Sequence, residues 1–304
     1  RDKGIVHQKK NEWMLAHTFF TKCVELKPDA AGYNGLLATS AFMLEDYSFA
    51  AKFYQSALSL DSSNKAWWHR LARSCFKIGD LKGAERAYQE LLKINEDPII
   101  RSAYNEVLRL LHSGSTDVSD SYYDEVYTIS ENYKKRGSES AYGVVWNRIS
   151  ELLRAHQIKS ILDLGCGPGQ FAEHIDQNNH KVAYCGVDFS AVAVEYAKIR
   201  CPNFAFFQAK LPVDNYQVFC DFDCIVSTEV LEHIDGDIEL MASFPAGKFM
   251  VGTVPNYDSF GHVRIFSNSE AVSKRYGSFF NSIVIEPISI SATNVIWLFF
   301  GSLR

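Results

Sequence analysis

A glycine-rich turn that joins an apolar run to a helical pattern is the feature of this sequence that most directly suggests chemistry. Residues 161–169 read Ile-Leu-Asp-Leu-Gly-Cys-Gly-Pro-Gly. Glycine is favoured where a ligand must touch the backbone or where φ is positive. The spacing G-x-G-x-G differs from the G-x-G-x-x-G of dinucleotide-binding turns, and an acid just before the glycines would repel a pyrophosphate. The turn therefore predicts a site for a ligand that carries an ammonium group, lined by Asp163, Gly165, Cys166, Gly167 and Gly169.

This segment resembles the first motif of class I S-adenosylmethionine-dependent methyltransferases, and the resemblance extends over roughly residues 120–304. It implies S-adenosylmethionine as the cofactor. Asp188 stands at the end of the next strand, and the resemblance implies that it accepts hydrogen bonds from both ribose hydroxyls. Phe189 is expected to pack on the adenine face. The alternative for Asp188 is an acid that caps the following helix.

Further cofactor contacts are expected after the third and fourth strands. Relatives often carry an acid after the third strand that accepts from the adenine amino group, but residues 206–212 contain no acid. Gln208, through its amide oxygen, and the backbone near Ala209 are the candidates in its place. Ser227 and Glu229 are expected at the carboxyl end of the fourth strand, where open α/β sheets bind ligands.

Glu232 and His233 are the candidate catalytic residues, expected on the first turn of a helix after the fourth strand. His233 would remove the proton of a substrate hydroxyl as the methyl group arrives. Glu229, Glu232 and His233 with the distant His262 also resemble the metal cluster of small-RNA 2′-O-methyltransferases. The string Glu-Val-Leu-Glu-His also occurs in class I relatives without metal, so we predict no metal here. The remaining alternative is that these residues only start a helix and form a polar wall.

Four residues are candidates for contacts with the methyl acceptor. Asn256 follows the fifth strand, and the segment 261–267 contains His262 and Arg264. An arginine can hold a carboxylate or phosphate through two parallel hydrogen bonds, although Arg264 could equally form a surface ion pair. Tyr127 belongs to an aromatic-rich stretch ahead of the sheet that could form a lid over the cofactor.

The elements that must position these residues alternate between strands and helices from residue 159 onward. This rhythm predicts a mostly parallel, seven-stranded sheet of the class I methyltransferase type. Residues 281–288 and 293–300 have no helix between them, so we expect a closing hairpin that contributes an antiparallel strand. Ser267 or Ser269 is expected to cap the helix before this hairpin. The other predicted strands are 160–164, 182–188, 204–208, 222–228 and 248–254, and the predicted helices include 144–153, 170–177 and 191–200.

The first third of the chain repeats with a period of 34 residues. A period of this length with small and aromatic positions resembles the tetratricopeptide repeat, a helix-turn-helix unit. The alternative is a generic bundle of helical hairpins. Such repeats form surfaces on which other chains pack, so we expect this part to bind a protein partner. We divide the chain into a repeat domain at 1–112, a linker at 113–121 and a methyltransferase domain at 122–304. The repeating positions are Ala16, Ala50 and Ala84, followed four residues later by Phe20, Tyr54 and Tyr88.

Composition narrows the class of protein. The chain has 304 residues, 47% of them hydrophobic and 22% charged, which is typical of a globular protein with two domains. No run of 18 apolar residues occurs, so we expect no membrane span. The net charge is about +3 over residues 1–115 and about −8 over the rest, which argues against a nucleic acid as partner.

The seven cysteines form no CxxC pair, which is typical of reduced thiols in the cytoplasm. Because the sequence begins with Arg1, we expect it to be part of a longer chain.

These observations combine into one function hypothesis and two alternatives. The α + α/β chain is expected to be an S-adenosylmethionine-dependent methyltransferase with an oxygen acceptor, because His233 offers a base. The strings Glu-Val-Leu-Glu-His-Ile and Gly-His-Val-Arg-Ile-Phe-Ser resemble those of bacterial small-molecule and glycan-modifying methyltransferases. This resemblance implies a cell-surface polysaccharide or its lipid-linked precursor as the acceptor. The alternatives are a metal-dependent RNA 2′-O-methyltransferase and a non-catalytic scaffold that binds S-adenosylmethionine.

Overall fold

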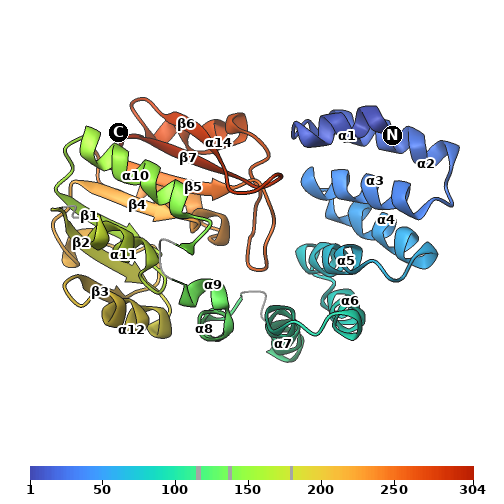
Figure 1. The fold of residues 1–304 in the computed structure, drawn as a ribbon, viewed down its shortest axis with the longest axis horizontal. Coiled ribbons are helices and arrows are strands. Elements are labelled where there is room, and N and C mark those ends of the chain that lie inside the picture. The colour runs from blue at the N-terminus through green and yellow to red at the C-terminus, as the bar shows by residue number, and fades with distance from the viewer. Residues whose placement is uncertain (114–117, 136–138, 179–180) are drawn as a thin grey trace. The chain divides into compact units, whose positions relative to one another are not determined.

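The computed structural model describes residues 1–113, 118–135, 139–178 and 181–304, which fall into two compact units, Arg1–Tyr122 and Tyr123–Arg304 (Figure 1). Helix α7 (Pro98–Ser113) ends in the stretch 113–121 that the sequence predicts as a linker, and helix α8 (Asp120–Ile129) begins in it. Residues 114–117 of that stretch lie outside the described residues.

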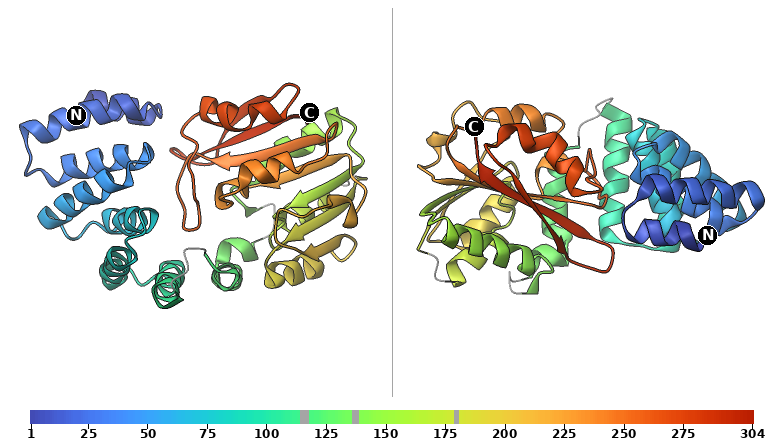
Figure 2. Two further views of the ribbon diagram at one scale, coloured as in Figure 1. Left: turned by 180° about the vertical axis from the view of Figure 1, so that it is seen from behind. Right: turned by 90° about the horizontal axis from the view of Figure 1, so that it is seen from above.

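The first unit is a run of helices, each of which packs on the next, as both views in Figure 2 show. Helices α2, α4 and α6 begin 34 residues apart, and their small and aromatic repeat positions are all fully buried. Asp46 and Asp80 occupy the same repeat position and cap α4 and α6 through their side chains. The predicted helical repeat is therefore confirmed. Besides α7, the helices of this unit are α1 (Asp2–Lys9), α2 (Trp13–Leu26), α3 (Ala31–Met43), α4 (Tyr47–Leu60), α5 (Lys65–Lys77) and α6 (Leu81–Ile94).

The second unit is built on one seven-stranded sheet with the strand order β3-β2-β1-β4-β5-β7-β6. Strands β1 to β5 pair in parallel, and β7 pairs antiparallel to both β5 and β6. The predicted parallel sheet with an antiparallel terminal strand is thus confirmed. The strands are β1 (Ser160–Leu164), β2 (Ala183–Asp188), β3 (Ala205–Gln208), β4 (Cys224–Thr228), β5 (Phe249–Pro255), β6 (Val284–Ser289) and β7 (Val295–Ser302).

Helices cover both faces of the sheet because successive strand residues point to opposite faces. Ile161 packs with the apolar faces of α10, α11 and α12, whereas its neighbour Leu162 packs with α13 and α14. The order of the strands reverses between β1 and β4, so the carboxyl ends of these strands border a crevice where ligands bind in open α/β sheets. The helices are α9 (Glu131–Lys134), α10 (Gly143–Ala155), α11 (Gln170–Gln177), α12 (Ala191–Arg200), α13 (Asp237–Ala242) and α14 (Ser269–Tyr276), with 3-10 turns η2 (Tyr216–Val218), η3 (Leu231–His233) and η4 (Gly277–Phe279).

Two local predictions were wrong. Glu232 and His233 lie in the short 3-10 turn η3 and not in an α-helix, since Ile234 is already extended. The side chain that caps α14 is Asn268, which accepts from the backbone N–H of Ala271, so neither Ser267 nor Ser269 is the cap. Within the described residues, no helix is both long and apolar enough to cross a bilayer.

Candidate active site

The glycine turn after β1 uses its three glycines for two different purposes. All three have positive φ, at 75°, 52° and 79°. A Cβ on Gly165 would lie 2.2 Å from a methyl carbon of Val230, and one on Gly169 would lie 2.9 Å from the Cα of Ala197. These two glycines are therefore required by packing. A Cβ on Gly167 would meet nothing closer than 3.7 Å, so this part of the backbone is open to a ligand.

Asp188 ties the glycine turn to the end of β2. One carboxylate oxygen accepts from the N–H of Gly167 at 2.9 Å, and the other accepts from the N–H of Ser190 at 2.9 Å. The helix that follows is capped by Ser190, so the alternative interpretation of Asp188 as the capping acid is wrong. Burial raises the pKa of Asp188 to about 6. The carboxylate is held beside the open backbone of Gly167 with lone pairs left for further donors.

Asp163 is buried beneath the same turn. One of its carboxylate oxygens accepts from the hydroxyl of Tyr184, and the other has no hydrogen-bond partner among the described residues. Burial raises the pKa of Asp163 to about 7. A buried carboxylate oxygen without a donor is costly unless a cationic or hydrogen-bonding ligand compensates for it. Together with the open backbone at Gly167, this oxygen fits a ligand that carries an ammonium group.

The other predicted cofactor residues surround this turn. The side-chain amide of Gln208 donates to the carbonyl of Phe189 at 3.0 Å, and the N–H of Ala209 donates to the carbonyl of Asp188 at 2.9 Å. The hydroxyl of Ser227 is buried and has no hydrogen-bond partner among the described residues. The thiol of Cys166 is buried too, and burial raises its pKa well above the usual value.

Tyr127, predicted as a substrate contact, lies on α8 against the cofactor turn. Its hydroxyl is the nearest atom to the open side of Gly167. Burial and the nearby carboxylate of Asp188 raise the pKa of the phenol well above its usual value. Tyr127 therefore stays neutral and can donate a hydrogen bond to a ligand in the turn.

Glu229 directly follows β4, and its carboxylate is held by a ring of hydroxyl groups that the sequence did not reveal. Its oxygens accept from Thr253 at 3.1 Å, from Tyr142 at 3.3 Å and from Tyr257 at 3.4 Å. Burial raises its pKa to about 7, against the effect of these hydrogen bonds. Tyr142 belongs to the aromatic-rich stretch that the sequence marked as a lid, but nothing in the sequence pointed to Tyr257.

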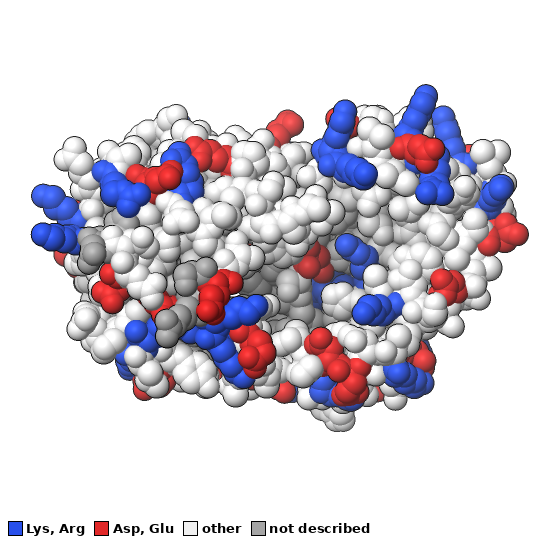
Figure 3. Space-filling model, in the orientation of Figure 1, with Lys and Arg blue, Asp and Glu red and all other residues white. Residues whose placement is uncertain are grey.

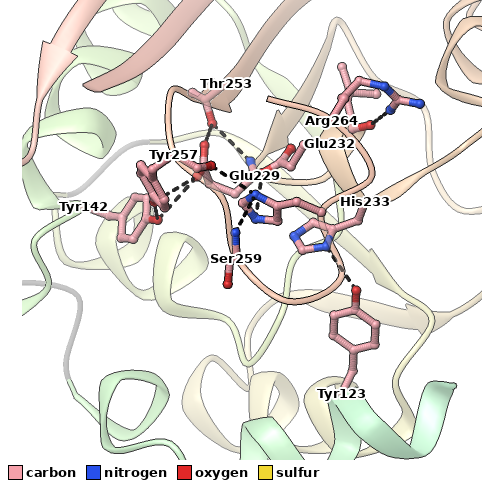
Figure 4. Close-up of polar contacts among 11 residues, drawn as sticks. Tyr123, Tyr142, Glu229, Glu232, His233, Thr253, Tyr257, Ser259 and Arg264 are labelled. Carbon is pink, nitrogen blue, oxygen red and sulfur yellow. Dashed lines mark hydrogen bonds and ion pairs between the residues drawn. The ribbon is translucent and has the colours of Figure 1, made fainter. Parts of the chain in front are cut away.

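Glu232, His233 and His262 meet in space and form what we call the Glu–His cluster. Figure 4 labels its members Glu232 and His233. One ligand atom of each lies within 4.8 Å of those of the other two, and Nε2 of His262 lies 4.0 Å from Glu232. The Glu232 carboxylate is fully buried, and neither oxygen has a hydrogen-bond partner among the described residues. Burial and the nearby Glu229 raise its pKa well above the usual value. The cluster can therefore take up a proton or hold a cation.

Arg264 and Asn256 have roles other than the predicted acceptor contacts. The guanidinium of Arg264 donates to the carbonyls of residues 231, 234 and 235 and pairs with Asp237 at 3.2 Å, so it fixes the backbone around the Glu–His cluster. The side chain of Asn256 accepts from the N–H of Val295 and donates to the carbonyl of Thr293. It therefore anchors the start of β7 to the end of β5.

Replacing Asp237 by alanine should destabilise the domain strongly. Asp237 is fully buried and accepts from both Arg275 and Tyr276. Burial opposes its charge, but these donors hold its pKa below the usual value. Removing one member of a buried ion pair costs about 3–5 kcal/mol, because the partner charge is left uncompensated. Urea unfolding of Asp237→Ala measures this loss, and the exposed Glu239 on the same helix supplies the matched control Glu239→Ala. Equal stability of the two variants would contradict the role assigned to this network.

Comparisons with known proteins agree with the two units. Residues 131–280 match the family model of a methyltransferase domain, and residues 41–107 match that of a tetratricopeptide repeat. The BBSome complex member BBS4 of Xenopus tropicalis is 34% identical over 88 residues, which is 29% of this chain but only 17% of that protein.

Solved structures resemble parts of the chain. The methyltransferase domain of bacterial CtHen1 is 18% identical with a TM-score of 0.41, over 52% of this chain and 97% of that one. The PH0226 protein of Pyrococcus horikoshii OT3 is 14% identical with a TM-score of 0.46, over 59% of this chain and 99% of that one. The family models, together with the glycine turn and the sheet order, show that residues 131–280 form an S-adenosylmethionine-dependent methyltransferase domain, which follows tetratricopeptide repeats.

Proposed function

We propose that this domain methylates a hydroxyl group of a small-molecule or glycan acceptor, such as a cell-surface polysaccharide or its lipid-linked precursor, in the cytoplasm. The observation that carries the proposal is the Glu–His cluster, formed by the segments after β4 and β5 at the same edge of the sheet as the Asp188 carboxylate. A hydroxyl acceptor must lose its proton, and an imidazole such as that of His233 is the side chain that most often serves as a general base. In the proposed arrangement the repeat unit docks the enzyme to a protein partner.

The cofactor would lie across the carboxyl ends of β1 and β2. Asp188 would accept from the ribose hydroxyls, Phe189 would pack on the adenine, and the free oxygen of Asp163 would compensate for the ammonium group. Tyr127 would donate to the methionine end of the cofactor beside Gly167. When bound, S-adenosylmethionine supplies a methyl group on a sulfonium, so that transfer to a hydroxyl leaves S-adenosylhomocysteine and one proton. Beyond proton transfer, the protein mainly has to align the acceptor with that methyl group.

Affinity for S-adenosylhomocysteine should rise with pH between about pH 5.5 and about pH 8. Burial raises the pKa of Asp163 to about 7 and that of Asp188 to about 6, so both acids are partly protonated at the lower pH. The bound ligand favours their charged forms. A folded pKa above that of the unfolded chain means that the free domain loses stability as pH rises through this range. The gain in melting temperature on adding S-adenosylhomocysteine should therefore be larger at the higher pH, and a gain that is constant or falls would contradict this assignment.

A neutral or zwitterionic acceptor suits the charges around the methyltransferase sheet better than a polyanion. Acidic and basic side chains lie next to one another on the face shown in Figure 3. Several basic groups of this unit are paired with acids among the described residues and are therefore less available to neutralise phosphates. These pairs are Lys134 with Glu131, Arg148 with Glu151 and Glu286, Lys198 with Glu195, Arg200 with Glu173, and Arg275 with Asp237.

Transfer of a labelled methyl group tests the acceptor class. The full chain is incubated with S-adenosylmethionine that carries a tritiated methyl group and with a panel of sugars, lipid-linked oligosaccharides and small RNAs. We expect label in a sugar fraction as an ether, which resists the mild alkali that releases methyl esters. Label only in a methylated amine or in a methyl ester would overturn the proposal of a hydroxyl acceptor. Binding of S-adenosylhomocysteine without transfer to any acceptor would support the scaffold alternative.

The Glu–His cluster also favours a second candidate, a metal-dependent RNA 2′-O-methyltransferase. A carboxylate and two imidazoles with ligand atoms within 4.8 Å of one another are a plausible set for a divalent cation. The same transfer assay separates the two candidates when it is run with EDTA and with added Mn²⁺. Transfer to RNA that EDTA abolishes and Mn²⁺ restores would support this candidate, whereas transfer to a glycan that is indifferent to EDTA would exclude it.

A further inference from the structure

A tyrosine on α8 contacts one ring nitrogen of His233. The hydroxyl of Tyr123 lies 3.0 Å from Nδ1 of His233, across 110 positions of the chain (Figure 4). The two rings meet edge to face with their centroids 5.8 Å apart. Since the two nitrogens lie on different sides of an imidazole ring, a hydrogen bond at Nδ1 directs Nε2 away from the tyrosine.

The loop after β5 packs directly on this hydrogen bond. Gly261 has φ of +90°, and a Cβ at this position would lie 2.3 Å from the hydroxyl of Tyr123 and 3.2 Å from Nδ1 of His233. The backbone therefore approaches the contact so closely that only glycine leaves room for it. His262, the next residue, stacks edge to face on the imidazole of His233 with centroids 4.6 Å apart. Helix α8 and the loop after β5 thus hold one ring in one orientation.

Tyr123 also reaches the cofactor side of the site. Its ring meets that of Phe189 edge to face with centroids 5.1 Å apart. Phe189 directly follows Asp188, the acid that we assign to the ribose. The neighbouring Asp124 on the same helix accepts from the hydroxyl of Ser190, so α8 is fastened to the end of β2 at two consecutive residues. Tyr123 therefore contacts both Phe189, which we propose packs on the adenine, and His233, the candidate base.

We propose that Tyr123 is a positioning residue that accepts the Nδ1–H of His233 and so presents the lone pair of Nε2 to the acceptor. This inference rests on the proposed function, because a base at Nε2 requires the proton of the neutral ring to sit on Nδ1. When Nε2 takes the proton of the acceptor hydroxyl, the ring becomes an imidazolium whose Nδ1–H remains hydrogen-bonded to Tyr123. The acceptor oxygen exchanges that proton for the methyl group, and Tyr123 itself neither gains nor loses a proton.

Nitrogen NMR of the histidine rings tests the proposal without any acceptor. The full chain is labelled with ¹⁵N-histidine and studied at about pH 8, where an ordinary imidazole is neutral; His233→Gln identifies the His233 signals. We expect one tautomer in the unaltered protein, with Nδ1 protonated and Nε2 not. Tyr123→Phe should give averaged signals for both nitrogens, because it loses the hydroxyl and keeps the ring. An unprotonated Nδ1 in the unaltered protein, or identical spectra in the two proteins, would overturn the proposal.

Further variants separate positioning from a general loss of structure. Gly261→Ala places a methyl group against the Tyr123 hydroxyl, so it should disrupt the same hydrogen bond and change the His233 signals in the same way. Tyr196→Phe removes a hydroxyl from an exposed tyrosine on α12 and should leave the His233 signals unchanged.

Calorimetry with S-adenosylhomocysteine should show affinity within about threefold for Tyr123→Phe, which keeps the contact with Phe189, and a larger loss for Tyr123→Ala. If the unaltered protein fails to bind S-adenosylhomocysteine, the proposed function falls, while the NMR result still decides the role of Tyr123.

Discussion

Asp188→Ala is expected to reduce the affinity for S-adenosylhomocysteine by roughly 10²–10⁴-fold. Two ribose hydroxyls would donate to this carboxylate, and hydrogen bonds to a charged group are worth about 1.5–3 kcal/mol each. The same substitution also removes the acceptor for the N–H groups of Gly167 and Ser190, so the turn loses part of its support. Isothermal titration calorimetry of the full chain measures the effect, and the melting temperature without ligand shows how much of it comes from the turn.

The neighbouring Asp124 supplies the matched control. It lies on α8, and its carboxylate accepts from the hydroxyl of Ser190, two residues after Asp188. Asp124→Asn therefore removes one nearby negative charge without removing the proposed ribose contact. We expect its affinity to stay within about tenfold of the unaltered protein. If both variants lose affinity equally, the negative charge of the crevice and not a specific contact of Asp188 governs binding.

Most of the sheet follows from local sequence patterns. The predicted strand at 160–164 and the predicted helices at 170–177 and 191–200 agree with the structure to the residue. Apolar runs of strand length alternate with helical spacing there, and glycines mark the turn between them. The repeat unit was equally predictable, because its 34-residue period fixes small and aromatic positions that must be buried between neighbouring helices.

The arrangement of the polar side chains was less predictable. A hydroxyl group carries no spacing signal, so the tyrosines that hold Glu229 and His233 could be recognised only once α8, α10 and the loop after β5 were placed in space. Arg264 is an example of a residue that the sequence marks as a candidate ligand contact but that binds backbone carbonyls in the structure. Its sequence context suggests a ligand contact, but the sharp turn at η3 exposes several carbonyl groups to one side, and a guanidinium with five donors satisfies them. Side chains that serve the backbone cannot be told from those that serve a substrate by residue type alone.

Gly167→Ala is expected to weaken the binding of S-adenosylhomocysteine by roughly 5- to 150-fold while the domain stays folded. The new methyl group would point to the side of the turn where the structure has no atom closer than 3.7 Å, so it should not disturb the packing. Alanine at a φ of +52° costs about 1–2 kcal/mol, which a folded domain tolerates. A ligand that must touch this backbone would instead meet the methyl group, and overpacking of this kind costs about 1–3 kcal/mol. Loss of the hydrogen-bonding geometry at the neighbouring N–H groups adds to that cost.

Gly169→Ala provides the contrast that makes this result specific. Its φ of +79° is similar, but its Cβ would lie 2.9 Å from the Cα of Ala197, on the backbone of α12. Backbone cannot turn aside as a side chain can, so this variant should lose stability by more than the strain at Gly167 and should melt at a clearly lower temperature. The two variants thus distinguish a glycine that the packing of the domain requires, Gly169, from a glycine that ligand binding requires, Gly167. Equal loss of stability with unimpaired binding at Gly167 would mean that the open side of the turn does not receive the cofactor, and the assignment of Asp163 and Asp188 would then have no ligand to explain.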